Sequence, residues 1–170
     1  MGLEKITIKL QEALQGAQRL ASKSGHAELK CEHLLLGLIQ QEGGLAVDLL
    51  EKAGVDITVL KARLITLLDR EPQVAGVSEQ PQLERNLRAT LDFADEVRSE
   101  MGDDFLSVEH VVLSMAKVSG SGNELLIGAG ATEEALEDSL REVRGSQAVT
   151  DENPEEKYQA LEKYGTDLCV

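Results

Sequence analysis

The sequence predicts an all-α fold in which two pseudo-symmetric four-helix repeats pack as one globular domain. Three observations support this prediction. Apolar residues recur every three or four positions along most of the chain, one stretch resembles a later stretch, and aromatic residues are scarce. Because the 170 residues include only two Phe, two Tyr and no Trp, Leu and Ala must supply most of the packing, and both favour helices.

The internal repeat is clearest where Gly25–Leu36 aligns with Gly102–Leu113, since both segments carry a Glu-His pair followed by apolar residues. The upstream helices match in the same register, with Leu10, Leu14, Ala17 and Leu20 corresponding to Leu87, Leu91, Ala94 and Val97. We therefore predict one domain over residues 1–145, with repeat one at about 7–71 and repeat two at about 82–145. Each repeat alone would expose an apolar face, which packing of the two would bury.

The first helix of repeat one is expected to begin after Thr7, whose hydroxyl can accept a hydrogen bond from a free amide of the first turn. The second helix of the two repeats begins near Glu32 and Glu109. Ser107 is a good N-cap for it in repeat two, whereas Lys30 is a poor one in repeat one.

The third helix of repeat one is predicted over Leu45–Lys52. The fourth starts at Asp56, an N-cap residue, and ends near Arg70. No segment alternates apolar and polar residues convincingly, so the sequence predicts no β-sheet.

Segments 71–81 and 146–170 have the composition of connectors. The first contains two prolines and a glycine and is predicted to link the repeats. The second begins with a polar stretch and ends in a predicted helix from Glu155 to about Tyr164.

The composition argues against several kinds of partner. A net charge of −14, from 31 acidic and 17 basic residues, disfavours nucleic acids and anionic membranes, which both attract basic surfaces. It permits basic or apolar polypeptides. No apolar run approaches the ~20 residues that span a bilayer. Cys31 and Cys169 are far apart in sequence, so a reducing, cytoplasmic location is the default interpretation.

No sequence pattern indicates catalysis. The chain lacks a G-x-x-x-x-G-K-[ST] phosphate-binding loop and a G-x-S-x-G nucleophile elbow. The Glu-His pairs at 32–33 and 109–110 are interpreted as helix-start residues, because Glu interacts favourably with free amides there. His26, Cys31 and His33 offer metal-binding atoms but too few for a structural zinc site. We therefore predict no catalytic, cofactor or metal site.

Two aromatic residues of repeat two are candidates for binding. Phe93 lies to one side of the predicted buried stripe, on the flank that Val97 shares, and Phe105 lies in the loop before the next helix. Either aromatic side chain could be tucked into the core or could form the wall of an apolar groove that holds unfolded chains.

Residues 32–38 (Glu-His-Leu-Leu-Leu-Gly-Leu) and 50–56 (Leu-Glu-Lys-Ala-Gly-Val-Asp) make the chain similar to the Clp N-terminal repeat family. Residues 41–44, 72–76 and 158–168 resemble the ClpB branch, the last of them the helix that leads into its first AAA+ module. The resemblance implies a substrate-binding N-terminal domain of a protein disaggregase. The whole protein would then be a cytoplasmic hexameric AAA+ ATPase that uses ATP and Mg²⁺ and works with a DnaK-type chaperone.

On this resemblance the fragment itself would be monomeric and would bind unfolded or aggregated polypeptides without hydrolysing ATP. An alternative is the adaptor-docking domain of a ClpC- or ClpA-like protease unfoldase. An independent enzyme is a third alternative, which would need a cleft of perturbed titratable groups.

The resemblance also associates certain positions with substrate handling. Thr7, Asp103 and Glu109 match such positions, whereas Glu84 stands where the family usually has Ser or Thr. His110 stands where many relatives have an apolar residue. The candidate substrate-binding or coupling residues are therefore Thr7, Phe93, Val97, Asp103, Phe105, Glu109 and His110.

Overall fold

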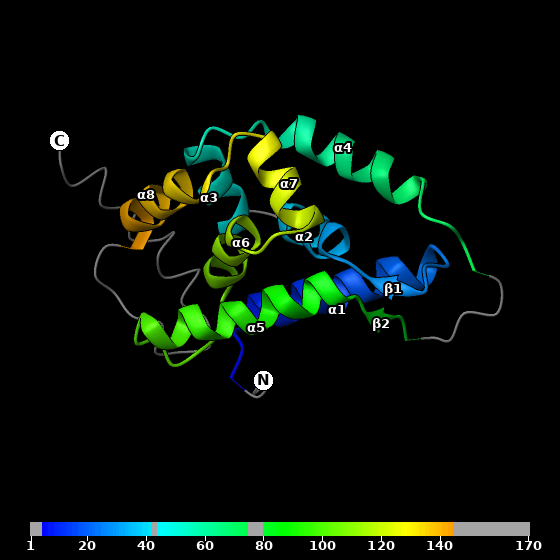
Figure 1. The fold of residues 1–170 in the computed structure, drawn as a ribbon, viewed down its shortest axis with the longest axis horizontal. Helices are drawn as coiled ribbons and strands as arrows, with labels where there is room; N and C mark the ends of the chain where they lie inside the picture. Colours follow the sequence, from blue (N-terminus) through cyan, green and yellow to red (C-terminus); the bar gives the residue numbers. More distant parts are fainter. Residues whose placement is uncertain (1–4, 42–43, 75–79, 145–170) are drawn as a thin grey trace.

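The computed structural model describes residues 5–41, 44–74 and 80–144, and it confirms the all-α fold (Figure 1). Repeat one contains α1 (Ile8–Lys23), α2 (Cys31–Ile39), α3 (Leu45–Lys52) and α4 (Ile57–Asp69). Repeat two contains α5 (Arg85–Glu100), α6 (Val108–Lys117), α7 (Ser121–Gly128) and α8 (Glu133–Arg144). The predicted final helix lies outside the described residues. None of the described helices has the length and apolar character needed to cross a bilayer.

The predicted N-caps of α1 and α4 are present. The Thr7 hydroxyl accepts a hydrogen bond from the Leu10 amide at 3.3 Å, and the Asp56 carboxylate accepts one from the Val59 amide at 3.2 Å. Glu84 caps α5 in the same way, because its carboxylate accepts from two amides of the first turn. The departure from Ser or Thr at this position therefore preserves the capping role.

The recurring histidine explains how α2 begins without a good N-cap side chain. The backbone amide of Lys30 donates to Nδ1 of His33 at 2.9 Å, and the amide of Ser107 donates to Nδ1 of His110 at the same distance. In both repeats the imidazole thus satisfies an amide at the helix start, which is the work of the third residue in a capping box.

The two repeats share one core. Helices α2 and α6 lie at its centre and are buried along nearly their whole length. Helix α3 of repeat one packs on α6 and α8 of repeat two, and α7 of repeat two packs on α2 of repeat one. The third helix of each repeat therefore covers the second helix of the other (Figure 1). Most fully buried large side chains are leucines, as the scarcity of aromatic residues requires.

A short parallel pairing corrects the prediction that no sheet occurs. Strand β1 (Glu28–Leu29) pairs with β2 (Gln82–Leu83), and Ile6 forms an isolated parallel bridge with Leu106. Strands of two residues are too short to produce an alternating pattern, so the sequence carried no signal for them.

These two pairings are copies of each other. In the repeat alignment Leu29 corresponds to Leu106, and Leu83 corresponds to Ile6. The hydrogen bonds match as well: the residue after each paired position, Thr7 or Glu84, donates its amide to the opposite leucine carbonyl at 2.9 Å. The segment that precedes the first helix of each repeat is thus bonded to the other repeat, as pseudo-twofold symmetry demands.

Candidate functional site

An apolar stripe runs along one flank of α5 and past its C-terminal end. Phe93, Val97 and Met101 are four residues apart, a spacing that places side chains on the same flank. Phe93 is half-buried against the core and Met101 is 37% exposed, whereas Val97 is only 6% exposed. Val97, which was a candidate binding residue, therefore belongs to the core and is not part of an exposed surface. Phe105, in the following loop, is half-buried against the core.

Phe93, Met101 and Phe105, which we call the apolar face, have no apolar counterparts in repeat one. The alignment places Gly16, Ser24 and Glu28 at the three equivalent positions. Structural packing common to both repeats cannot account for the three large side chains, because the first repeat folds without them.

A buried ionic cluster lies next to Met101, since Nη1 of Arg144 is 3.9 Å from the Met101 sulfur. Nε2 of His110 donates to Asp103 at 2.6 Å, since Nδ1 of this ring accepts from the Ser107 amide. The Arg144 guanidinium, at the end of α8, forms an ion pair with the other carboxylate oxygen of Asp103. Burial lowers the pKa of His110, although the Asp103 carboxylate acts in the opposite direction. Because Nδ1 accepts a hydrogen bond, the imidazole is in a neutral tautomer, and the charges of Asp103 and Arg144 face each other.

Glu109 adds a second carboxylate to the cluster. One of its oxygens accepts a short hydrogen bond from the Ser107 hydroxyl, and the other lies 3.8 Å from Nη1 of Arg144. Both Glu109 and Asp103 are at least 98% buried. A cationic partner that reaches both carboxylates is thus needed to keep them charged inside the domain.

The cluster holds the loop that carries Phe105. Asp103, two residues before Phe105, is fixed by His110 and Arg144. Leu106, one residue after it, is bonded through its carbonyl to the Thr7 amide. The structure therefore brings Thr7, Asp103, Glu109 and His110 together around the loop that carries Phe105. All four side chains are buried. They can position the apolar face but cannot touch a bound polypeptide without rearrangement.

Sequence reasoning missed Arg144, although the repeat alignment contained a signal for it. Arg144 aligns with Leu68, and Asp103 aligns with His26. In repeat two these two positions carry opposite charges, whereas in repeat one both residues are neutral. Such a paired difference between the repeats indicates an ion pair. In repeat one a hollow of about 180 Å³ lies beside Leu68 and His26, between α1 and α4.

The corresponding cluster of repeat one is a pair of histidines. Nε2 of His33 lies 2.9 Å from Nδ1 of His26, and both rings are buried. Cys31 does not join them, because its thiol donates to Asn86 at 3.4 Å. Among the described residues no group of three or more His, Cys, Asp or Glu side chains is arranged to bind a metal.

We expect the His33→Gln variant to be less sensitive to acid than the unaltered domain. Burial and the neighbouring His26 lower the pKa of His33 to about 4, against ~6.5 when unfolded. Because the pKa of His33 is lower in the folded state, the contribution of His33 to stability is fully present above about pH 6.5. This contribution is lost as the pH falls toward 4. The unaltered domain should therefore lose ~2 kcal/mol more unfolding free energy than the variant between about pH 7 and about pH 4.5.

Urea unfolding curves at both pH values measure this difference. Gln can still accept the Lys30 amide as the third residue of a capping box, so the variant should fold. Equal losses of unfolding free energy in the unaltered domain and in the variant would contradict the lowered pKa of His33.

The fold and the buried cluster define a small helical domain with two interlocked repeats, and comparison with known proteins identifies its family. The family described as "Clp repeat (R) N-terminal domain" matches residues 5–129. The chain belongs to this family.

Among relatives, the chain is 43% identical over 164 residues to the chaperone protein ClpB of Mycobacterium tuberculosis strain H37Rv. This match covers 96% of the chain and 19% of the relative. It is 40% identical over 173 residues to the chaperone protein ClpB of Bacillus cereus, covering 100% of the chain and 20% of that relative. The chain thus spans about a fifth of the length of these relatives and is similar to their N-terminal regions.

Solved structures share the fold. The N-terminal domain of the ClpV1 ATPase from the E. coli EAEC Sci1 T6SS superposes with a TM-score of 0.71 at 28% identity, covering 90% of this chain and 92% of that one. The Hsp104 N-terminal domain from Candida albicans superposes with a TM-score of 0.78 at 17% identity, covering 89% and 99%. Because the identity to the Hsp104 N-terminal domain is only 17%, this similarity shows the fold alone.

Proposed function

We propose that this domain binds unfolded or aggregated polypeptides through the apolar face and passes them to the pore of a ClpB-type disaggregase. The observation that carries the proposal is the presence of Phe93, Met101 and Phe105 in repeat two, at positions where repeat one has small or polar residues. Partly exposed aromatic and Met side chains suit the capture of varied apolar segments, because they offer large, adaptable contact areas.

In this proposal the buried cluster has a positioning role. Asp103, Glu109, His110 and Arg144 hold the loop on one side of Phe105, and Thr7 holds it on the other. Their effect on substrate handling would be indirect, through the placement of Phe105. Binding by one domain would be weak, since a small apolar face buries little area and an unfolded chain loses entropy when it is ordered.

The whole protein would be a cytoplasmic homohexameric AAA+ ATPase that uses ATP and Mg²⁺ and cooperates with a DnaK-type chaperone. The similarity to ClpB chaperones over nearly the whole chain supports this part of the proposal. The domain itself would be monomeric and would contribute no catalytic residue. Six weak binding faces in one ring would gain affinity for a long client through avidity.

Replacing both aromatic residues, Phe93→Ser with Phe105→Ser, should weaken binding of an unfolded client by at least ~10-fold. The client is a permanently unfolded, fluorescently labelled polypeptide, and anisotropy measures its affinity. A matched control is Val59→Ser, which removes an apolar side chain that is 63% exposed on α4. Val59→Ser should leave the affinity unchanged.

An NMR titration of the unaltered domain provides a second measurement that does not depend on how well the variants fold. Client-induced shifts should cluster at Phe93, Met101 and Phe105. Shifts confined to other surfaces would contradict the proposal, as would equal affinity losses in the double variant and the control.

The alternative function is docking of a folded adaptor in a protease unfoldase. A ClpV N-domain has been solved in complex with a VipB peptide, so a domain of this fold can also take a defined peptide partner. A second titration, with a client that can fold, separates the two functions. Loss of binding when this client folds supports capture of unfolded chains, whereas retained binding to its folded form favours docking.

A further inference from the structure

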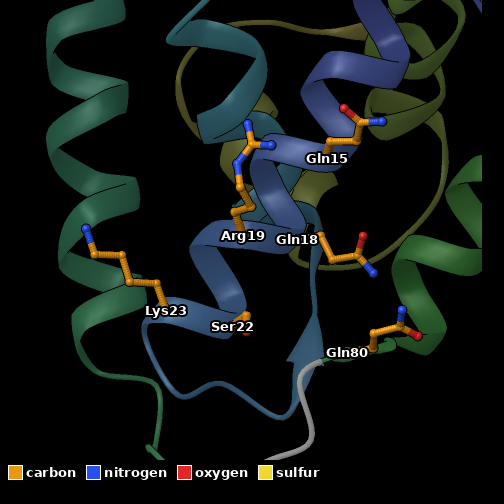
Figure 2. Close-up of a pocket in the computed structure, with 6 residues that line it drawn as sticks. All are labelled: Gln15, Gln18, Arg19, Ser22, Lys23 and Gln80. Carbon is orange, nitrogen blue, oxygen red and sulfur yellow. The ribbon is translucent and has the colours of Figure 1, made fainter.

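A second candidate surface lies in repeat one, away from the apolar face. A hollow of about 620 Å³ is lined by residues of α1 and by Gln80, which precedes β2. The residues that line it are Gln15, Gln18, Arg19, Ser22, Lys23 and Gln80. Figure 2 shows Gln18 and Gln80 on the same side of α1, although they come from different segments, whereas Arg19 extends along α1 toward Gln15 and Lys23 extends toward α4. This volume lies within the range of pockets that hold small ligands.

The residues that line this hollow are cationic or neutral, in a protein whose net charge is −14. Gln15, Gln18, Arg19 and Ser22 lie at the i, i+3, i+4 and i+7 spacing of one helix face, and all four are exposed. Within the described part of the chain, neither Arg19 nor Lys23 forms an ion pair. Both cations are exposed and remain available for an anionic group.

The equivalent face of α5 carries the opposite charge. The repeat alignment pairs Gln15, Gln18, Arg19 and Lys23 of α1 with Asp92, Asp95, Glu96 and Glu100 of α5. The cations of α1 are therefore not a requirement of the repeat fold, because its second copy forms the same helix with carboxylates. The two repeats present one cationic hollow and one acidic helix face.

We propose that the α1 hollow binds a short acidic segment of an extended polypeptide. Arg19 and Lys23 would contact carboxylates of that segment, and the amides of Gln15, Gln18 and Gln80 would hydrogen-bond its backbone, since a side-chain amide both donates and accepts. Two cations are too few for the phosphate backbone of a nucleic acid, which engages many basic groups along its length. This surface is separate from the apolar face and does not depend on the proposed function.

The probe is a Gly/Ser peptide with spaced Glu residues, and the same peptide with Gln in place of Glu is its reference. In an NMR titration at about 0.05 M NaCl, the Glu peptide should shift Gln15, Gln18, Arg19, Ser22, Lys23 and Gln80. The double variant Arg19→Gln with Lys23→Gln should weaken this binding by at least ~5-fold. Raising NaCl to about 0.5 M should weaken it in the unaltered domain, because exposed charges are screened.

The matched control removes the same charge elsewhere. Lys61→Gln with Arg88→Gln alters two exposed cations on α4 and α5, and it should leave binding within twofold. Equal weakening by the two double variants would overturn the proposal, as would equal binding of the Glu and Gln peptides. Salt-sensitive self-association through α1 and the acidic face of α5, detected by sedimentation, would also overturn it in favour of a second copy of the chain.

Discussion

Replacing Arg144 with leucine, the residue that repeat one has at the equivalent position, should destabilise the domain by ~3–5 kcal/mol. The guanidinium is the cation that faces two buried carboxylates, since it forms an ion pair with Asp103 and lies 3.8 Å from Glu109. Leucine would fit the volume but would leave both carboxylates without that charge. Breaking a buried pair is costly because the remaining charge is already removed from water.

Urea unfolding followed by circular dichroism measures this loss. The control is Arg141→Leu on the same helix, where Arg141 pairs with Asp138 and both side chains are 66% exposed. Removal of this surface ion pair should cost less than ~1 kcal/mol. A similar small effect for Arg144→Leu would contradict the structural role of the cluster. If the variant folds, its apolar face should bind unfolded client less well, because the loop of Phe105 has lost an anchor.

The second large effect is expected for Gly120→Ala, with a cost of ~2–4 kcal/mol. Gly120 precedes α7 and has a φ of 152°, which side-chain-bearing residues rarely adopt. A Cβ built there would lie 2.1 Å from Nδ2 of Asn86, so the Asn86 side chain would have to move. It would then lose its hydrogen bonds to the Ser119 carbonyl and the Cys31 thiol. These contacts hold the start of α5 to both α2 and the loop before α7.

The control Gly54→Ala separates strain from steric conflict. Gly54 has a φ of 99°, but no heavy atom lies within 4 Å of a Cβ built on it, so only the strain, ~1–2 kcal/mol, should appear. A double-mutant cycle adds a second test. In an Asn86→Ala background, Gly120→Ala should cost no more than Gly54→Ala, because the atoms that obstruct the methyl group are gone. Equal costs for Gly120→Ala and Gly54→Ala in the unaltered background would contradict the steric conflict.

Much of the fold was predictable from the sequence because its signals are local or repeated. The N-caps Thr7 and Asp56 and the helix Leu45–Lys52 lie where helical spacing and capping chemistry placed them. The pairing of Leu29 with Leu83 was not predictable, since two residues carry no period and their partner is far away in sequence. Once the repeat was recognised, either pairing would have implied the other.

The candidate site was predictable only in part. Phe93 and Phe105 were candidates because one lies beside the buried stripe of its helix and the other lies in the loop before the next helix, and the structure leaves both of them half-buried. Asp103, Glu109 and His110 were named as a group through family resemblance, yet their burial depends on Arg144, which comes from the last described helix. A contact between residues that are 41 positions apart cannot be inferred from helical spacing.

The matched backbone bonds between Thr7 and Leu106 and between Glu84 and Leu29 have a consequence for the origin of this architecture. A protein consisting of a single such repeat could form both bonds with a second identical molecule, because each bond joins the leading segment of one repeat to the loop of the other. The contact between the halves is therefore of the kind that a symmetric homodimer uses. Two such repeats joined in one chain are free to differ from each other, so that one can carry an apolar face and the other a cationic hollow.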